Sequence, residues 1–290
     1  MHPLKPLLIQ LYYHGTYPYR RRWQRQAVRA GRAPVVVPVF HRIADDAAND
    51  WTTPLADFRA AVLWLKRHFD LISLEETQRR VRSGRNDRPS VSLTFDDGYA
   101  ENAAALDLLL ELEVPCTYFV TTRPVIERSP FEHDRQMGNH FAANTVEELR
   151  RLARAGIEIG AHTRTHCDLA QIDDAELLYD ELVAARDDLQ HALDTSIRYF
   201  AFPFGLHENL SVAGFRAARE AGYAGACSAY GGYNFPGDDA FHIQRRCVDG
   251  PAICLKNWAV IDPWRYGRTP RFEYQVQSSR RQPAAVGACE

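Results

Sequence analysis

Short apolar runs alternate with amphipathic segments along most of this chain. The apolar runs are rich in β-branched and aromatic residues and predict buried strands: "APVVVPVFH", "SVSLTFDD", "PCTYFVTT", "IEIGAHT", "IRYFAFPFG" and "YAGACSAY". The segments between them, such as "PLADFRAAVLWLKRHF", carry apolar residues at helical spacing. This alternation from Val35 to about Tyr230 predicts parallel strands joined by helical crossovers, in either a barrel or a doubly wound sheet.

Local signals refine this picture. Thr145 and Glu148 form a predicted capping box at the start of "TVEELRRLARAG", and Gly156 ends that helix. The segment "DDAELLYDELVAARDDLQHAL" predicts one long helix, and residues 123–144 read as a polar loop. "FHIQRRCVDG" predicts a late strand. We therefore expect a catalytic domain at 34–268, a basic extension at 1–33 and a mobile tail at 269–290.

The composition is that of an ordinary soluble globular protein. Hydrophobic residues make up 46% of the 290 residues, charged residues make up 25%, and the formal net charge is −2. This charge gives no global attraction to nucleic acid, so we expect no nucleic-acid partner. The six cysteines lack zinc-finger spacing, and we expect them to be reduced.

The N-terminal segment lacks the features of a signal peptide, because its apolar run is short and its positive charges follow that run. No stretch of about eighteen apolar residues occurs in the chain. We therefore predict a cytoplasmic protein. The basic segment 20–32 has two interpretations, a solvated helix packed on the domain or a peripheral contact with an anionic membrane surface.

Ionisable residues gather where the predicted strands end. His41 ends the first strand, Asp96 and Asp97 end the third, and His162 and His166 follow "IEIGA". In parallel α/β folds the functional site lies at the C-terminal ends of the strands. We therefore expect these side chains to lie together.

Two histidines and one carboxylate form a common ligand set for a catalytic zinc. If a helical turn starts at the strand end, His162 and His166 face the same way, and Asp97 supplies the carboxylate. The positive charge of the ion would offset the repulsion between Asp96 and Asp97, and would leave Asp96 as the proton acceptor. Each motif alone is weak, since "DDG" is often a turn and two histidines four apart occur by chance. Together, on successive strand ends, they are much stronger.

The motifs "TFDDGY", "HTRTH" and "FAFPFG" resemble the first three motifs of the polysaccharide deacetylases, the NodB-homology or carbohydrate esterase family 4 group. "VPVFHRI" and the segment after it resemble the opening of the poly-N-acetylglucosamine deacetylase subgroup, and the likeness covers about residues 34–250. The resemblance implies a single-domain α/β fold, a distorted (β/α) barrel. It also implies one divalent ion, with zinc expected first and cobalt or nickel as alternatives.

The resemblance also implies roles for individual residues. Asp96 corresponds to the catalytic base, and the metal ligands correspond to Asp97, His162 and His166. Many members carry the general acid in a late L-x-H motif, which "PAICLKNWAVID" lacks. In the poly-N-acetylglucosamine subgroup that element lies on the N-terminal strand, so His41 resembles the displaced acid.

Two assignments depart from the family pattern. Many members have an arginine just before the third-motif proline, and this chain has "FAFP" there. Arg245 is a candidate to orient Asp96 in its place. His242 competes with His41 as the acid and is also a candidate substrate contact.

The predicted reaction is hydrolysis of an N-acetyl group from an amino sugar of a polysaccharide, oligosaccharide or lipid-linked precursor. We expect Pro203 and Phe204 to form a wall of the sugar cleft, the backbone N–H near Tyr99 to stabilise the oxyanion, and the loop 123–144 to cap the cleft. Phe131, His133 and Asn139 are candidate contacts in that loop. Two other readings stay open: a metal-dependent amidohydrolase acting on a non-sugar C–N bond, and a non-catalytic carbohydrate-binding homologue.

Overall fold

The main sheet has eight parallel strands. The structure is a computed structural model, and it describes residues 4–266 and 268–274. Successive neighbours in the sheet are β12 (His242–Ile243), β11 (Gly225–Cys227), β10 (Tyr199–Ala201), β9 (Glu158–Ala161), β8 (Cys116–Val120), β7 (Leu93–Phe95), β2 (Pro38–Phe40) and β13 (Arg246–Cys247).

The connectivity of this sheet makes it curl. Strands β12 and β13 form its opposite edges, yet only Gln244 and Arg245 separate them along the chain. The Cα atoms of Ile243 and Arg246 are three residues apart and lie at most about 11 Å from each other, so the two edges must lie close together. The sheet is therefore a curled, distorted barrel, and the fold predicted from the sequence is confirmed. The closure also places Arg245 where the two edges meet.

Helices cover the sheet and follow the predicted pattern. They include α2 (Leu55–His68), α3 (Leu74–Arg82), α4 (Ala103–Glu111), α7 (Val146–Ala155), α10 (Val212–Glu220), α11 (Ala252–Ala259) and α12 (Pro263–Tyr266). Helix α7 has the predicted capping box between Thr145 and Glu148, and it ends at Gly156 in a left-handed conformation. Two small parallel sheets complete the fold, one of β1 (Val35–Val36), β6 (Ser90–Val91) and β5 (Asp70–Leu71), and one of β3 (Arg42–Ile43) and β4 (Thr52–Thr53).

The structure differs from the sequence prediction in two segments. The predicted loop 123–144 contains two short helices, α5 (Thr122–Glu127) and α6 (Glu132–Gln136). The predicted long helix consists of α8 (Ala175–Tyr179) and α9 (Ala185–Leu193), joined by a π-helical turn at Asp180–Ala184. The π-helical turn carries Glu181, which is buried and binds backbone groups near the candidate site. The periodicity of the sequence does not predict the π-helical turn, because the turn depends on contacts of Glu181 with a distant part of the chain.

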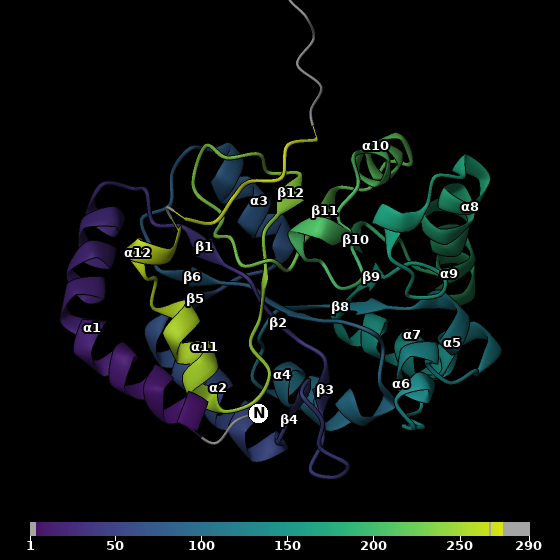
Figure 1. The fold of residues 1–290 in the computed structure, drawn as a ribbon, viewed down its shortest axis with the longest axis horizontal. Helices are drawn as coiled ribbons and strands as arrows, with labels where there is room; N and C mark the ends of the chain where they lie inside the picture. The colour runs from purple at the N-terminus through teal and green to yellow at the C-terminus, as the bar shows by residue number, and fades with distance from the viewer. Residues whose placement is uncertain (1–3, 267, 275–290) are drawn as a thin grey trace, which may run out of the picture.

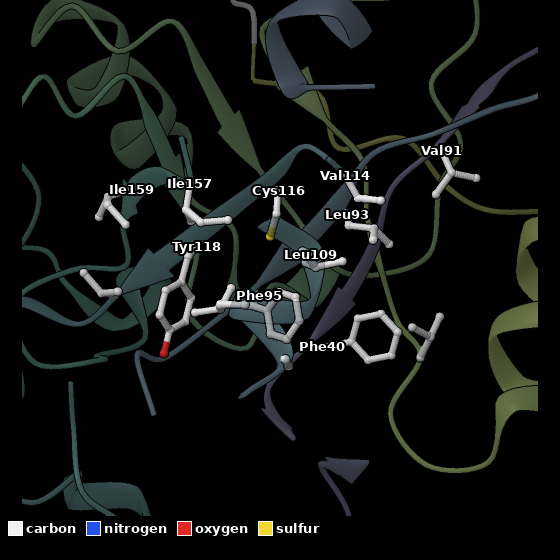
Figure 2. Packing of buried hydrophobic residues seen from close by; sticks show 14 of the residues in the cluster. Phe40, Val91, Leu93, Phe95, Leu109, Val114, Cys116, Tyr118, Ile157 and Ile159 are labelled. Atoms are coloured by element: carbon white, nitrogen blue, oxygen red, sulfur yellow. The ribbon is translucent and has the colours of Figure 1, made fainter. Parts of the chain in front are cut away.

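Aromatic rings fill the core below the ends of β2 and β7. Phe40 packs edge-on against Phe58 at a centroid distance of 5.2 Å, and Phe95 packs against Phe58 at 5.5 Å. Figure 2 shows Phe40, Phe95 and Tyr118 gathered with Leu109 and apolar side chains of the neighbouring strands. This packing fixes the two strand ends from which the candidate site residues emerge.

Helix α1 (Leu4–Arg29) lies along one flank of the domain, next to α11 (Figure 1). The Arg20 side chain is fully buried, and its guanidinium donates to the carbonyls of Asn257 at 2.9 Å and Val260 at 3.1 Å. The basic segment is thus part of a helix that docks on the domain. None of the described helices is long and apolar enough to cross a membrane. Most of the predicted tail, residues 275–290, lies outside the described residues.

Candidate active site

A tight turn after β7 presents the two carboxylates. The backbone N–H of Asp96 donates to the Phe40 carbonyl at 2.9 Å, which continues the pairing of β7 with β2. Asp97 and Gly98 then adopt positive φ angles of 75° and 103°. A Cβ at position 98 would lie 3.2 Å from the Cβ of Val120, so the turn requires glycine there.

The two histidines come from an irregular loop after β9, not from a helical turn. Thr163 and His166 have left-handed φ angles of 59° and 64°, and the His166 N–H donates to the Thr163 hydroxyl at 2.9 Å. The Glu181 carboxylate accepts the N–H groups of Arg164 and Thr165, each at 3.0 Å. The expected helical turn is therefore wrong, because Glu181 and Thr163 hold the loop in a different shape.

Asp97, His162 and His166 meet in a geometry that suits a metal ion. Asp97 Oδ1 lies 3.5 Å from His162 Nε2 and 3.2 Å from His166 Nε2. His162 Nδ1 donates to the Ala201 carbonyl at 2.8 Å, which leaves Nε2 for a ligand. Asp97 Oδ1 is buried and lacks a hydrogen-bond partner among the described residues. These donors fit a divalent cation, which would satisfy the orphaned oxygen.

Asp96 is held by Arg245 in a bidentate ion pair. The two guanidinium nitrogens donate to Asp96 Oδ1 at 2.7 Å and Oδ2 at 2.8 Å, and both side chains are buried. Burial alone would raise the pKa of Asp96, but the Arg245 charge outweighs burial and lowers it. The repulsion between Asp96 and Asp97, which we expected a metal ion to offset, is therefore offset in part by Arg245. The pKa of Asp97 is also held well below its usual range, because the close approach of the His162 and His166 imidazoles outweighs burial.

His41 forms a second acid–base pair, with Asp249. His41 Nδ1 lies 2.6 Å from Asp249 Oδ2, and the His41 backbone N–H donates to Asp249 Oδ1 at 3.1 Å. Burial lowers the pKa of His41, but the Asp249 carboxylate outweighs it and holds that pKa well above 6.5. Asp249 was not predicted from the sequence, although in "VDG" it follows the last strand as a carboxylate, as Asp96 and Asp97 follow β7.

A cleft of about 710 Å³ opens beside His166 and is also lined by His133 and Phe204, with parts of α5 and α6. Phe204 is 52% exposed, and its ring centroid lies 5.0 Å from that of His166. Phe204 holds a left-handed φ of 59°, a strained conformation of the kind found at functional sites. Pro203 is buried, so of the two predicted wall residues only Phe204 reaches the surface.

Two other predicted contacts, Tyr99 and Phe131, lie deeper than expected, since both side chains are buried. The Tyr99 side chain is fully buried, and its hydroxyl donates to Asp134 at 2.8 Å and lies 3.0 Å from His133 Nε2. Tyr99 therefore supports His133, whose ring centroid is 4.5 Å from that of His166. The predicted role of the Tyr99 backbone N–H stays open.

His242 occupies a different environment. Its Nε2 lies 2.9 Å from the Ser228 hydroxyl, and its ring packs against Phe215. Burial lowers the pKa of His242 to about 4, so the imidazole is neutral at pH 7 and poorly suited to donate a proton. The pairing of His41 with the Asp249 carboxylate suits the acid role better.

Residues 83–226 match the sequence profile of the polysaccharide deacetylases. A chitooligosaccharide deacetylase of Bradyrhizobium sp. (strain ANU 289) is 32% identical over 120 residues, which cover 40% of this chain and 47% of that protein. The chain belongs to the polysaccharide deacetylase family. A second relative with the same name, from Sinorhizobium fredii (strain NBRC 101917 / NGR234), is 31% identical over 120 residues, 41% of this chain and 48% of that protein. The chain spans about half the length of the curated relatives it matches.

The deacetylase fold extends beyond the matched segment. The structure of IcaB from Ammonifex degensii superposes with a TM-score of 0.65 at 19% identity, covering 79% of this chain and 98% of that chain. The matched segment 83–226 contains Asp96, Asp97, His162 and His166. The remaining site residues, His41, Arg245 and Asp249, lie outside it and join the site only through β2 and β13.

Proposed function

We propose that this polysaccharide deacetylase homologue is a metal-dependent hydrolase that removes N-acetyl groups from amino sugars. One observation carries the proposal: a buried carboxylate paired with an arginine lies beside a buried Asp–His–His ligand set. The names of the two curated relatives, both chitooligosaccharide deacetylases, support the substrate class. A non-catalytic binding protein would have no need for the charged base beside the ligands.

Asp96 acts as the base in this proposal. Its ion pair with Arg245 keeps it ionised and holds both of its oxygens in a fixed orientation. Asp96 Oδ2 lies 4.0 Å from His162 Nε2, so a water beside the ligand set would be within reach of this carboxylate. Asp96 would take the proton of that water as it attacks the acetyl carbonyl.

His41 acts as the acid. The Asp249 carboxylate keeps the imidazole protonated and fixes its orientation through Nδ1, so the opposite ring nitrogen can donate. An amine is a poor leaving group until it is protonated, and His41 would supply that proton as the C–N bond breaks. The charge of His41 also lowers the pKa of both Asp96 and Asp97.

Asp97, His162 and His166 would hold the divalent ion, with zinc expected first and cobalt or nickel as alternatives. When bound, the ion would polarise the acetyl carbonyl and the attacking water. Phe204 would stack against a sugar ring in the cleft, because the C–H faces of sugars pack on exposed aromatic surfaces.

The proposal includes a location. We infer a cytoplasmic protein that acts on a lipid-linked or soluble precursor, peripheral at the inner membrane face. Helix α1 supports this, since Leu7, Leu8 and Leu11 are exposed on it, and Arg22 and Arg25 are exposed about three to four turns beyond Leu11. Flotation with anionic vesicles and no flotation with neutral vesicles is the expected result. The same flotation result with anionic and neutral vesicles would contradict the proposed membrane contact.

Acetate release from N-acetylated chitooligosaccharides tests the reaction. The wild-type protein with one equivalent of zinc, cobalt or nickel should release acetate. The isosteric variant Asp96→Asn should keep its metal and lose turnover by about 10²-fold or more. A panel of cyclic amides run beside the sugars tests the alternative: cleavage of the cyclic amides alone would move the function to another amidohydrolase class. Turnover close to wild type in Asp96→Asn would remove the base from the mechanism.

A further inference from the structure

A second group of metal-ligating side chains lies at the closing edge of the barrel. His41 follows β2, Cys247 ends β13, and Asp249 lies two residues further on. Asp249 Oδ2 lies 2.6 Å from His41 Nδ1, and it accepts the Cys247 thiol at 3.1 Å. The three candidate ligand atoms all lie within 4.8 Å of one another.

The donor set is one that favours zinc. Thiolate sulfur, imidazole nitrogen and carboxylate oxygen are its common protein ligands. In a tetrahedral zinc site with ordinary bond lengths, two such donors lie about 3.3 to 3.6 Å apart. The His41–Asp249 and Cys247–Asp249 pairs, at 2.6 and 3.1 Å, are closer than this by about 0.8 and 0.5 Å, so an outward rotation of the side chains would admit the ion. Magnesium and calcium prefer oxygen ligands and would not choose this set.

The cluster is accessible, and it differs from the first ligand set. Cys247 is exposed and His41 is 24% exposed, whereas Asp249 is 1% exposed and anchored by the His41 backbone N–H. Each of its three residues comes from the region around β2 and β13, so it shares no residue with Asp97, His162 and His166. One buried, fixed carboxylate with two more accessible donors is a suitable frame for an exchangeable ion.

We propose that His41, Cys247 and Asp249 form a second zinc site, which is inhibitory. Zinc would take the His41 Nδ1 position and the Cys247 sulfur, and both protons would pass to solvent. His41 would then be a neutral imidazole bound to metal and no longer the imidazolium that donates a proton. The inhibitory consequence rests on the proposed function, whereas the site itself does not.

Cobalt binding tests the site without any substrate. Apoprotein is titrated with Co²⁺, because a thiolate ligand gives a charge-transfer band in the near ultraviolet and the first ligand set contains no sulfur. We expect the wild-type chain to bind two ions and to show the band. Cys247→Ser should bind one ion and lack the band, whereas the matched control Cys254→Ser should behave as wild type.

The variant Asp97→Ala separates the two sites, since it should lose one ion and keep the charge-transfer band. A wild-type chain without the band, or a Cys247→Ser variant that retains it, would overturn the second site. These results do not depend on whether the protein deacetylates sugars.

Acetate release tests the inhibition. General acid catalysis contributes about 10²- to 10⁴-fold, so saturating the second site of the wild type with zinc should lower turnover by roughly 100-fold. Cys247→Ser should match the wild type at one equivalent of zinc and resist the excess. Equal inhibition of both proteins would show that excess zinc acts elsewhere and would overturn the inhibitory role. No turnover at one equivalent would instead count against the proposed function.

Discussion

Replacing Arg245 with methionine tests how the carboxylate pair is held. The change keeps much of the side-chain volume but removes the guanidinium that donates to both Asp96 oxygens at 2.7 and 2.8 Å. Both partners are buried, at 0% and 4% exposure, so the variant leaves an uncompensated carboxylate in the barrel. Breaking such a buried pair costs about 3–5 kcal/mol. For a chain of 290 residues this corresponds to a fall in Tm of roughly 5–8 °C.

Thermal unfolding followed by circular dichroism measures this loss. The double variant Arg245→Met/Asp96→Asn removes both charges, so it should recover a large part of the stability that Arg245→Met loses. Turnover should be lost in both single variants and in the double variant, which separates the structural effect from the chemical one. A double variant that loses the sum of the two single losses would show that the ion pair is not coupled, and would refute this reasoning.

Two further predictions address the acid and the packing of the sheet. In Asp249→Asn the carboxylate that raises the pKa of His41 is gone and burial remains, so that pKa should fall toward or below 6.5. The loss of kcat/KM on the alkaline side should therefore move to lower pH. Gly160→Ala places a Cβ 2.4 Å from Phe119 Cδ1 between β8 and β9, and this overpacking should cost about 1–3 kcal/mol.

Each of these predictions has a control. The His41–Asp249 pair contributes stability that is fully present below the unfolded pKa of about 6.5 and is lost as pH rises through the raised folded pKa. The Tm advantage of the wild type over Asp249→Asn should accordingly shrink at alkaline pH, and a constant difference would contradict the assignment. For the glycine, Gly15→Ala in α1 meets no atom within 4 Å and should cost nothing. Equal Tm values for Gly160→Ala and the wild type would mean that Phe119 moves aside freely.

The parts of the site that local sequence signals specify were predictable. Asp96 and Asp97 follow a β-branched strand directly, and His162 and His166 follow another, so strand-end reasoning brought all four together. His41 belonged to this group for the same reason, and the family resemblance gave it the role of the acid. Arg245 was a candidate only because it lies near a strand end. Its bidentate pairing with Asp96 depends on the closure of the barrel, which the sequence does not show.

The parts that depend on tertiary closure were not predictable. Asp249 reaches His41 because β13 pairs with β2, and no local pattern encodes a contact between residues 208 positions apart. The loop shape between His162 and His166 depends on Glu181, whose position requires a π-helical turn inside an apparently regular helix. Tyr99 and Pro203 were predicted to contact the substrate but are buried, since a sequence pattern does not tell which side chains the neighbouring elements will cover.

The metal content of the purified protein tests the central claim most directly. Elemental analysis is done in a Cys247→Ser background, which removes the proposed second site. It compares Cys247→Ser alone with Cys247→Ser/Asp97→Ala and Cys247→Ser/Asp96→Asn after equilibration with one equivalent of zinc and removal of unbound ion. The account predicts one ion per chain in Cys247→Ser and in Cys247→Ser/Asp96→Asn, and its loss in Cys247→Ser/Asp97→Ala, because Asp97 Oδ1 faces both His162 and His166. Equal metal content in Cys247→Ser and Cys247→Ser/Asp97→Ala, or none in any of the three proteins, would contradict it.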